Sequence, residues 1–151
     1  MARKTITVPE YFVFSMEYSV LYSDVNSANH LGADRVLPII MEAQLRFIKH
    51  LGFADATAFE DAGLIMAHSE VQYLAEAEYA DLLNIELAAD NFTEKSFEFI
   101  YRILNLSKGN EMARVVTTLL FFDYQDKRVI AVPEKFLERV REVMAQSMVN
   151  L

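Results

Sequence analysis

The sequence predicts an α+β protein in which an antiparallel β-sheet wraps around one central, apolar helix. The first half of the segment 32–51 is apolar on nearly every side of a helix, one strand-like stretch precedes this segment, and four long strand-like runs follow it. A helix with so broad an apolar surface has to be enclosed, and strands from both sides of it in the chain can enclose it. A second helix ends the chain, so the predicted order is β-α-β-β-β-β-α.

The first strand and the turn behind it are predicted from their residue types. The stretch 11–25 is rich in Phe, Tyr, Val and Ser and carries no helical stripe, which favours a strand. The Asp, Asn and Ser content of 23–29 is typical of a turn, because these side chains hydrogen-bond to nearby backbone.

The central helix is predicted over 32–51, with Gly52 as its terminator. Pro38 would then lie beyond the first turn, where a proline removes a backbone hydrogen bond. A proline at this place should bend the helix or delay its regular part, and we expect a kink. The apolar positions of the helix are Val36, Leu37, Ile39, Ile40, Met41, Ala43, Leu45, Phe47, Ile48 and Leu51.

The chain becomes strand-like after a short helical or irregular stretch near 57–62. Turn residues at 107–110 and 125–127 predict hairpins, so neighbouring strands should be antiparallel. The predicted strands are 64–75, 82–91, 95–106 and 111–124.

Two apolar faces complete the predicted core. In the strand 95–106 four successive positions of one face carry large apolar side chains, because alternate residues point to the same side. Pro133 suits the first turn of the final helix, which has an apolar stripe. The strand face consists of Phe97, Phe99, Tyr101 and Ile103, and the helix stripe of Phe136, Leu137, Val140, Val143 and Met144.

Composition limits the class of protein. A length of 151 residues with 53% hydrophobic content predicts a single domain, 1–151, with a sizeable core. A net charge of −8 and the lack of a basic patch argue against a nucleic-acid partner. The absence of cysteine excludes disulfides, thiolate metal sites and a cysteine nucleophile. Because no apolar run has the length of a signal peptide's core or a membrane span, we expect a cytoplasmic protein with no membrane partner.

A motif at the predicted turn resembles a known family. The segment 22–35, YSDVNSANHLGADR, followed by Glu42-Ala43-Gln44, resembles the Asp-Thr-Asp…Gly-His-Val-Asn-Asn…Glu-Ala-Arg signature of 4-hydroxybenzoyl-CoA thioesterase-like hotdog proteins. The segments 73–81, 93–97 and 131–134 are similar to later parts of the same family pattern. The resemblance implies the hotdog fold, hydrolysis of an acyl-CoA or related thioester, and no cofactor beyond the coenzyme A of the substrate.

Self-association is expected from the strands as well as from the resemblance. Long apolar strands leave edges that can pair with another chain. Hotdog domains usually join their sheets across a twofold axis, which places the sites at the subunit boundary. We therefore expect a homodimer or a dimer of dimers.

Thioester hydrolysis needs donors for the oxyanion, and the start of the central helix can provide them. If the helix starts near Gly32, the backbone N–H groups of Leu31, Gly32 and Ala33 are unpaired within it and lie at the positive end of its dipole. Gly32 also permits close approach of a substrate, although ordinary turn geometry explains a glycine there equally well.

The sequence leaves the reacting group open between several residues, because Asn26 stands where the family has the second acid of its motif. An amide can orient a water or a carbonyl, but it cannot accept a proton as a base. Asp24, His30 and Glu42 are the candidates to replace the acid. Each has a structural alternative: Asp24 as a cap of the turn, His30 as a structural hydrogen-bonding group, and Glu42 as the partner of Arg46 at i,i+4 spacing.

Two further residues and one type of site complete the predictions. The resemblance implies that Lys95 and Ser96 contact the pantetheine or the phosphates of coenzyme A. The structural alternative is that these two residues only begin a solvated strand. His50 and His68 lack the spacing of metal ligands, so no metal site is predicted.

The sequence leaves more than one function open. The first is hydrolysis, with Asp24, Asn26 and His30 handling the water. The second is a catalytically impaired hotdog protein that binds acyl thioesters or a protein partner, because Asn26 replaces the acid. Hydratase chemistry would need the same acid and histidine, and no second feature favours it.

Overall fold

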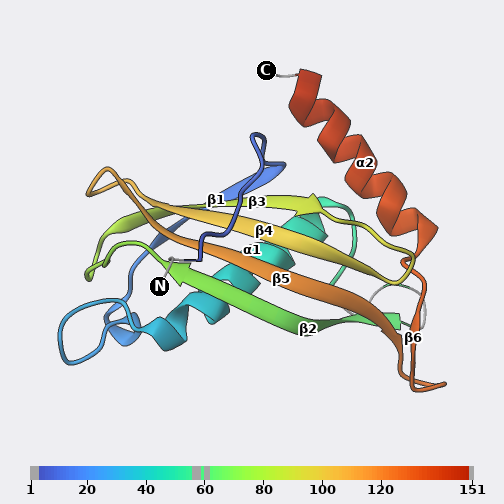
Figure 1. Ribbon diagram of the computed structural model, residues 1–151, viewed down its shortest axis with the longest axis horizontal. Coiled ribbons are helices and arrows are strands. Elements are labelled where there is room, and N and C mark those ends of the chain that lie inside the picture. The colour runs from blue at the N-terminus through green and yellow to red at the C-terminus, as the bar shows by residue number, and fades with distance from the viewer. Residues whose placement is uncertain (1–3, 56–58, 60–61, 150–151) are drawn as a thin grey trace.

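The computed structural model describes residues 4–55, 59 and 62–149, and in these residues a curved sheet wraps around one helix (Figure 1). The predicted α+β hotdog fold is confirmed. Figure 1 shows α1 behind the sheet, while α2 begins at one end of it and extends away. In chain order the elements are β1 Phe14–Ser19, the 3₁₀ turns η1 Tyr22–Asp24 and η2 Ala33–Arg35, α1 Val36–His50, β2 Ala62–Tyr73, β3 Leu82–Asp90, β4 Ser96–Asn105, β5 Asn110–Asp123, β6 Arg128–Ile130 and α2 Glu134–Val149.

The sheet is antiparallel throughout. The strand order is β1-β3-β4-β5-β2, and the short strand β6 pairs with the end of β5. The two hairpins predicted at 107–110 and 125–127 are confirmed, since they join β4 to β5 and β5 to β6. The strand β6 itself was missed, because a run of three residues gives no alternating pattern to detect.

The prediction of one strand over 11–25 is wrong at both ends. β1 covers only Phe14–Ser19, and the chain then folds into η1. The amide of Asp24 donates to the carbonyl of Leu21 at 2.9 Å, which closes a turn where a strand was expected.

The central helix begins later than predicted, at Val36 instead of Gly32. Pro38 is therefore the third residue of α1, in the first turn, where the backbone N–H has no partner within the helix. A kink and a delayed start of the regular helix were the two expected effects of this proline. The delayed start is observed, and it places Pro38 where no helical hydrogen bond is lost. The stretch predicted near 57–62 falls largely outside the described residues, and Ala62 already belongs to β2.

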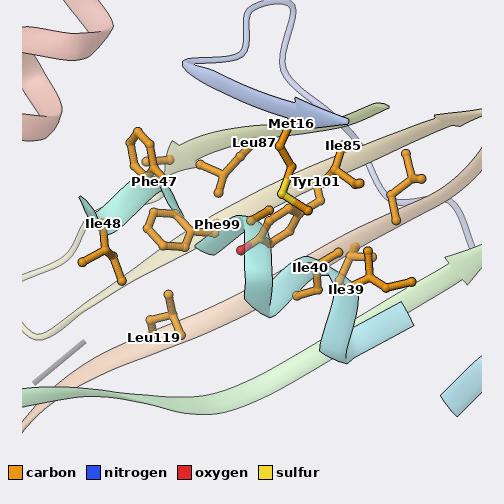
Figure 2. Packing of buried hydrophobic residues seen from close by; sticks show 14 of the residues in the cluster. Met16, Ile39, Ile40, Phe47, Ile48, Ile85, Leu87, Phe99, Tyr101 and Leu119 are labelled. Carbon is orange, nitrogen blue, oxygen red and sulfur yellow. The ribbon is translucent and has the colours of Figure 1, made fainter. Parts of the chain in front are cut away.

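The core lies between one face of α1 and the inner face of the sheet (Figure 2). The strand face predicted from 95–106 is confirmed, since its four side chains are at most 1% exposed. Phe136 and Val140 of the predicted α2 stripe are also buried, and Phe136 packs against Phe97 and Phe121. The α1 side chains buried against the sheet are those of Val36, Ile39, Ile40, Ala43, Phe47 and Ile48.

Within the part of the chain that the structure describes, neither helix has the length and apolarity needed to cross a membrane.

Candidate active site

The turn between β1 and α1 is a closed loop. Val25 and Leu31 form an antiparallel bridge, and the amide of Asn26 donates to the carbonyl of His30 at 2.9 Å. Asn29 has a φ of 63°, a left-handed conformation that asparagine tolerates better than most residues. The loop therefore brings the backbone of Asn26 against that of His30, with Asp24 just before the bridge.

Asp24 is enclosed at the base of this loop. Its side chain is buried and accepts hydrogen bonds from the hydroxyl of Tyr18 at 2.5 Å, from the amide of Leu21 at 2.9 Å and from Nε of Arg35 at 3.2 Å. These contacts tie β1, η1 and η2 together. The geometry therefore favours the structural interpretation of Asp24 over the catalytic one.

The ionisation of this cluster follows from its contacts. Burial alone would raise the pKa of Asp24, but hydrogen bonds from Tyr18, Leu21 and Arg35 outweigh burial and hold the pKa below its usual value. Burial, followed by the hydrogen bond to Asp24, raises the pKa of Tyr18 to about 12. Asp24 is thus a carboxylate and Tyr18 a neutral phenol near neutral pH.

Asn26 lies at the exposed rim of the loop. Its Oδ1 accepts from the amides of Ala28 at 3.0 Å and His30 at 3.3 Å, which is the turn-forming bonding that the residue type predicts. Among the described residues no acceptor pairs with its Nδ2, so this amide group can still donate to a bound water or substrate.

Two of the three predicted oxyanion donors are already bonded. The amide of Leu31 donates to the carbonyl of Ala77 at 2.7 Å, and the amide of Gly32 donates to the carbonyl of Asp24 at 2.9 Å. The prediction that both are free is wrong, because the helix starts after Gly32 and the extended segment before it pairs with other backbone. The amide of Ala33 meets no acceptor among the described residues, and the same holds for Asp34.

Gly32 is not required by its own backbone conformation, since its φ is −66°. A Cβ at this position would lie 2.4 Å from Oδ1 of Asp34, so the glycine leaves room for that carboxylate. The carboxylate is the far end of a side chain and can rotate away.

A cavity of about 270 Å³ opens beside this turn, between η2 and the end of β2. The hydroxyl of Tyr73 donates to the carbonyl of Ala33 at 2.8 Å and links the two sides of the cavity. Its lining is mostly apolar: Leu31, Ala33, Val36, Tyr73, Leu74, Ala75, Glu76, Ala77 and Met112.

His30 reaches the rim of the same cavity through Glu76. Nε2 of His30 lies 3.2 Å from Oε2 of Glu76, which lines the cavity. Sequence reasoning gave Glu76 no role, because it lies 46 positions further along the chain. The backbone bond between Leu31 and Ala77 brings the two segments side by side.

The remaining predicted residues lie apart from the turn. Glu42 is exposed on α1, and its carboxylate lies 3.4 Å from the guanidinium of Arg46. This is the i,i+4 pair that was predicted as the structural alternative for Glu42.

Lys95 and Ser96 lie where β4 starts, in a loop that Thr93 holds: its hydroxyl accepts a hydrogen bond from the amide of Ser96 at 3.0 Å. That loop is at the end of the sheet where α2 begins, opposite the 24–32 turn (Figure 1). Within one chain, Lys95 and Ser96 therefore do not join the site.

In the described residues, no three His, Cys, Asp or Glu side chains come together in a way that could hold a metal ion. The polar side chains that line the cavity are instead those of Glu76 and Tyr73, and His30 lies beside Glu76.

A sheet wrapped around a buried helix, with a polar loop packed on the start of that helix, defines a hotdog domain. The model of the thioesterase-like superfamily matches residues 20–140, and the chain belongs to this family. None of the functionally curated proteins matches it.

Solved structures with the same fold are similar over most of their length. A 1,4-dihydroxy-2-naphthoyl-CoA thioesterase from Synechocystis is 17% identical with a TM-score of 0.78, over 85% of this chain and 96% of that one. A hypothetical protein from Staphylococcus aureus in complex with CoA is 15% identical with a TM-score of 0.78, over 93% and 87% of the two chains. A gentisyl-coenzyme A thioesterase is 17% identical with a TM-score of 0.75, over 84% and 99%. At these identities the likeness shows a common fold.

Proposed function

We propose that this protein hydrolyses an acyl-CoA or a related acyl thioester at the cavity between η2 and the end of β2. The observation that carries the proposal is the amide of Ala33, which belongs to a cavity-lining residue at the start of η2, just before the central helix, and meets no acceptor among the described residues. Membership of the thioesterase-like superfamily supports the reaction class. The CoA thioesterases and the CoA complex among the similar structures support the substrate class.

The carbonyl oxygen of the thioester accepts a hydrogen bond from the amide of Ala33. This donor replaces those of Leu31 and Gly32, which are bonded within the protein. The amide lies at the positive end of η2 and α1, and it stabilises the negative charge that develops on the oxygen during attack.

The attacking water is held and deprotonated by the exposed side of the loop. His30 accepts a proton from the water as its oxygen bonds to the thioester carbon, and Nδ2 of Asn26 donates to that water. When the tetrahedral intermediate collapses, the carbon–sulfur bond breaks and His30 returns the proton to the thiolate of coenzyme A. The products are a carboxylic acid and free coenzyme A, and no cofactor takes part.

Asp24 acts in this scheme by holding the loop and not by touching substrate. Its carboxylate is buried, and Tyr18, Leu21 and Arg35 already donate to it. It is thus a structural residue of the loop in the proposed reaction.

A panel of acyl-CoA substrates, aliphatic and aromatic, tests the proposal by the release of free thiol. We expect turnover with at least one of them. The enzymatic proposal is overturned if well-folded protein hydrolyses none of the panel.

A second candidate function is the binding of acyl thioesters without hydrolysis. It is favoured by Asn26, which replaces the family's acid and whose Oδ1 already accepts two backbone amides. An Asn26→Asp variant distinguishes the two functions. A sharp gain of activity over a negligible native rate supports the binding function, whereas a robust native rate that His30→Ala abolishes excludes it.

We also propose that two copies associate through β2. Among the strands that the structure describes, β2 pairs only with β5, so its other edge can receive a strand. Lys95 and Ser96 could then contact coenzyme A only from the partner copy. Light scattering at micromolar concentration tests the association, and a monomer would contradict it.

A further inference from the structure

We propose that Glu76 is a positioning residue for His30, and that it holds the imidazole so that Nδ1 accepts the proton of the attacking water. The inference rests on the proposed function. Its geometric basis is the 3.2 Å contact between Nε2 of His30 and Oε2 of Glu76 at a cavity that Glu76 itself lines.

The contact determines which ring nitrogen can act as the base. A carboxylate only accepts hydrogen bonds, so Nε2 of a neutral imidazole facing it carries the proton and donates it. The lone pair is then on Nδ1. No side chain or backbone group of the described residues pairs with Nδ1, which leaves it available to a water.

The backbone on both sides fixes this pair. The amides of Leu74 and Ala75 donate to the carbonyl of Met112 at 2.9 and 3.1 Å, which anchors the segment just before Glu76. The residue after Glu76, Ala77, accepts from Leu31, and His30 forms a β-bridge with Glu78. Both side chains therefore project from anchored backbone.

Exposure indicates that the pair serves orientation more than stability. The side chain of Glu76 is 71% exposed and that of His30 is 35% exposed, and contacts between groups this exposed add little to folding stability, whether or not the imidazole is charged. The pair can thus be removed without unfolding the protein, which makes the proposal testable.

Glu78 provides a matched control. It is a second exposed glutamate of the same loop, but its carboxylate lies 3.4 Å from Nζ of Lys108 and not against the imidazole. Loss of its charge changes the loop's net charge by the same amount as loss of the Glu76 charge.

The first test is kinetic. We expect Glu76→Ala to lower kcat about 10-fold with an unchanged KM, while Glu78→Ala leaves both within about twofold. In a His30→Gln background Glu76→Ala should cost no further activity, because the two residues act as a unit. Additive losses, or an unchanged kcat in Glu76→Ala, would overturn the proposal.

The second test does not depend on activity. The imidazole ¹⁵N signals of His30 should move in Glu76→Ala and stay in place in Glu78→Ala, with His50 and His68 as internal references. If the signals move but no acyl-CoA is hydrolysed, the pairing stands and the proposed function fails. If the signals of His30 are unchanged by Glu76→Ala, the pairing itself is refuted.

Discussion

The two ends of the 24–32 turn are built in opposite ways. Asp24 is 1% exposed and accepts three hydrogen bonds from β1, η1 and η2. His30, six residues later, has a side chain that is 35% exposed, and its one side-chain partner among the described residues is Glu76, at the rim of a cavity. Both were candidates for the reacting group. A buried carboxylate whose two oxygens both accept hydrogen bonds inside the protein contributes to folding, whereas a side chain with unused hydrogen-bonding capacity at a cavity can act on a ligand.

The largest expected effect is on the exposed end of the turn. His30→Gln should lower kcat at least about 100-fold, because it removes the proposed general base, and should change the unfolding free energy by less than about 0.5 kcal/mol. Thiol release and urea denaturation measure the two quantities. His68→Gln, at an exposed position on β2, is the control and should behave as the native protein does. Native-like turnover in His30→Gln would exclude His30 as the base.

The buried end should respond in the opposite way. Asp24→Asn should lower the unfolding free energy by about 1–3 kcal/mol, since a neutral amide replaces a buried carboxylate that accepts from Tyr18 and Arg35. Urea denaturation measures the loss. Asp34→Asn changes an exposed acid of the same segment and should cost less than about 0.5 kcal/mol. Equal stabilities of the two variants would show that the buried contacts are not a source of stability.

The stability difference between native protein and Asp24→Asn should depend on pH. The folded-state pKa of Asp24 lies below the unfolded value of about 3.9, so its contribution is fully present above that value and is lost as pH falls through the folded-state pKa. We therefore expect the difference in unfolding free energy between the two proteins to be constant from about pH 6 to about pH 8 and to shrink below about pH 4. Urea midpoints of both proteins across this range measure it, and a difference that grows on acidification would contradict the assigned direction.

The smallest expected effect concerns the link across the cavity. Tyr73→Phe removes the hydroxyl that donates to the carbonyl of Ala33 and should cost about 0.5–1.5 kcal/mol of stability. Because that carbonyl belongs to the peptide that starts η2, we also expect a fall of a few-fold in kcat. Tyr124→Phe, on an exposed tyrosine beyond β5, is the control. An unchanged kcat would mean that the link has no part in placing the oxyanion donor.

Most of the fold could be predicted from local patterns. The alternation of Phe97, Phe99 and Tyr101 and the helical spacing of α1 are properties of neighbouring residues, and the buried faces follow both. The prediction that α1 is enclosed on nearly every side is wrong for this chain, because Met41 is 49% exposed. The start of α1 was placed too early, because nothing within the segment shows that Gly32 pairs with Asp24.

The site could be predicted only in part, because its decisive contacts join distant segments. The resemblance located the turn and its histidine. The bond from Leu31 to Ala77 and the pair of His30 with Glu76 each link positions 46 residues apart. Neither the pairing of the Leu31 amide nor the contact of Glu76 with His30 could therefore be inferred from either segment alone.

The turnover of folded Asp24→Asn tests the division of the turn most directly. Measured at a temperature where the variant is fully folded by circular dichroism, its kcat on the best acyl-CoA should stay within about threefold of the native value. A fall as large as that of His30→Gln would contradict the account and place Asp24 among the catalytic residues.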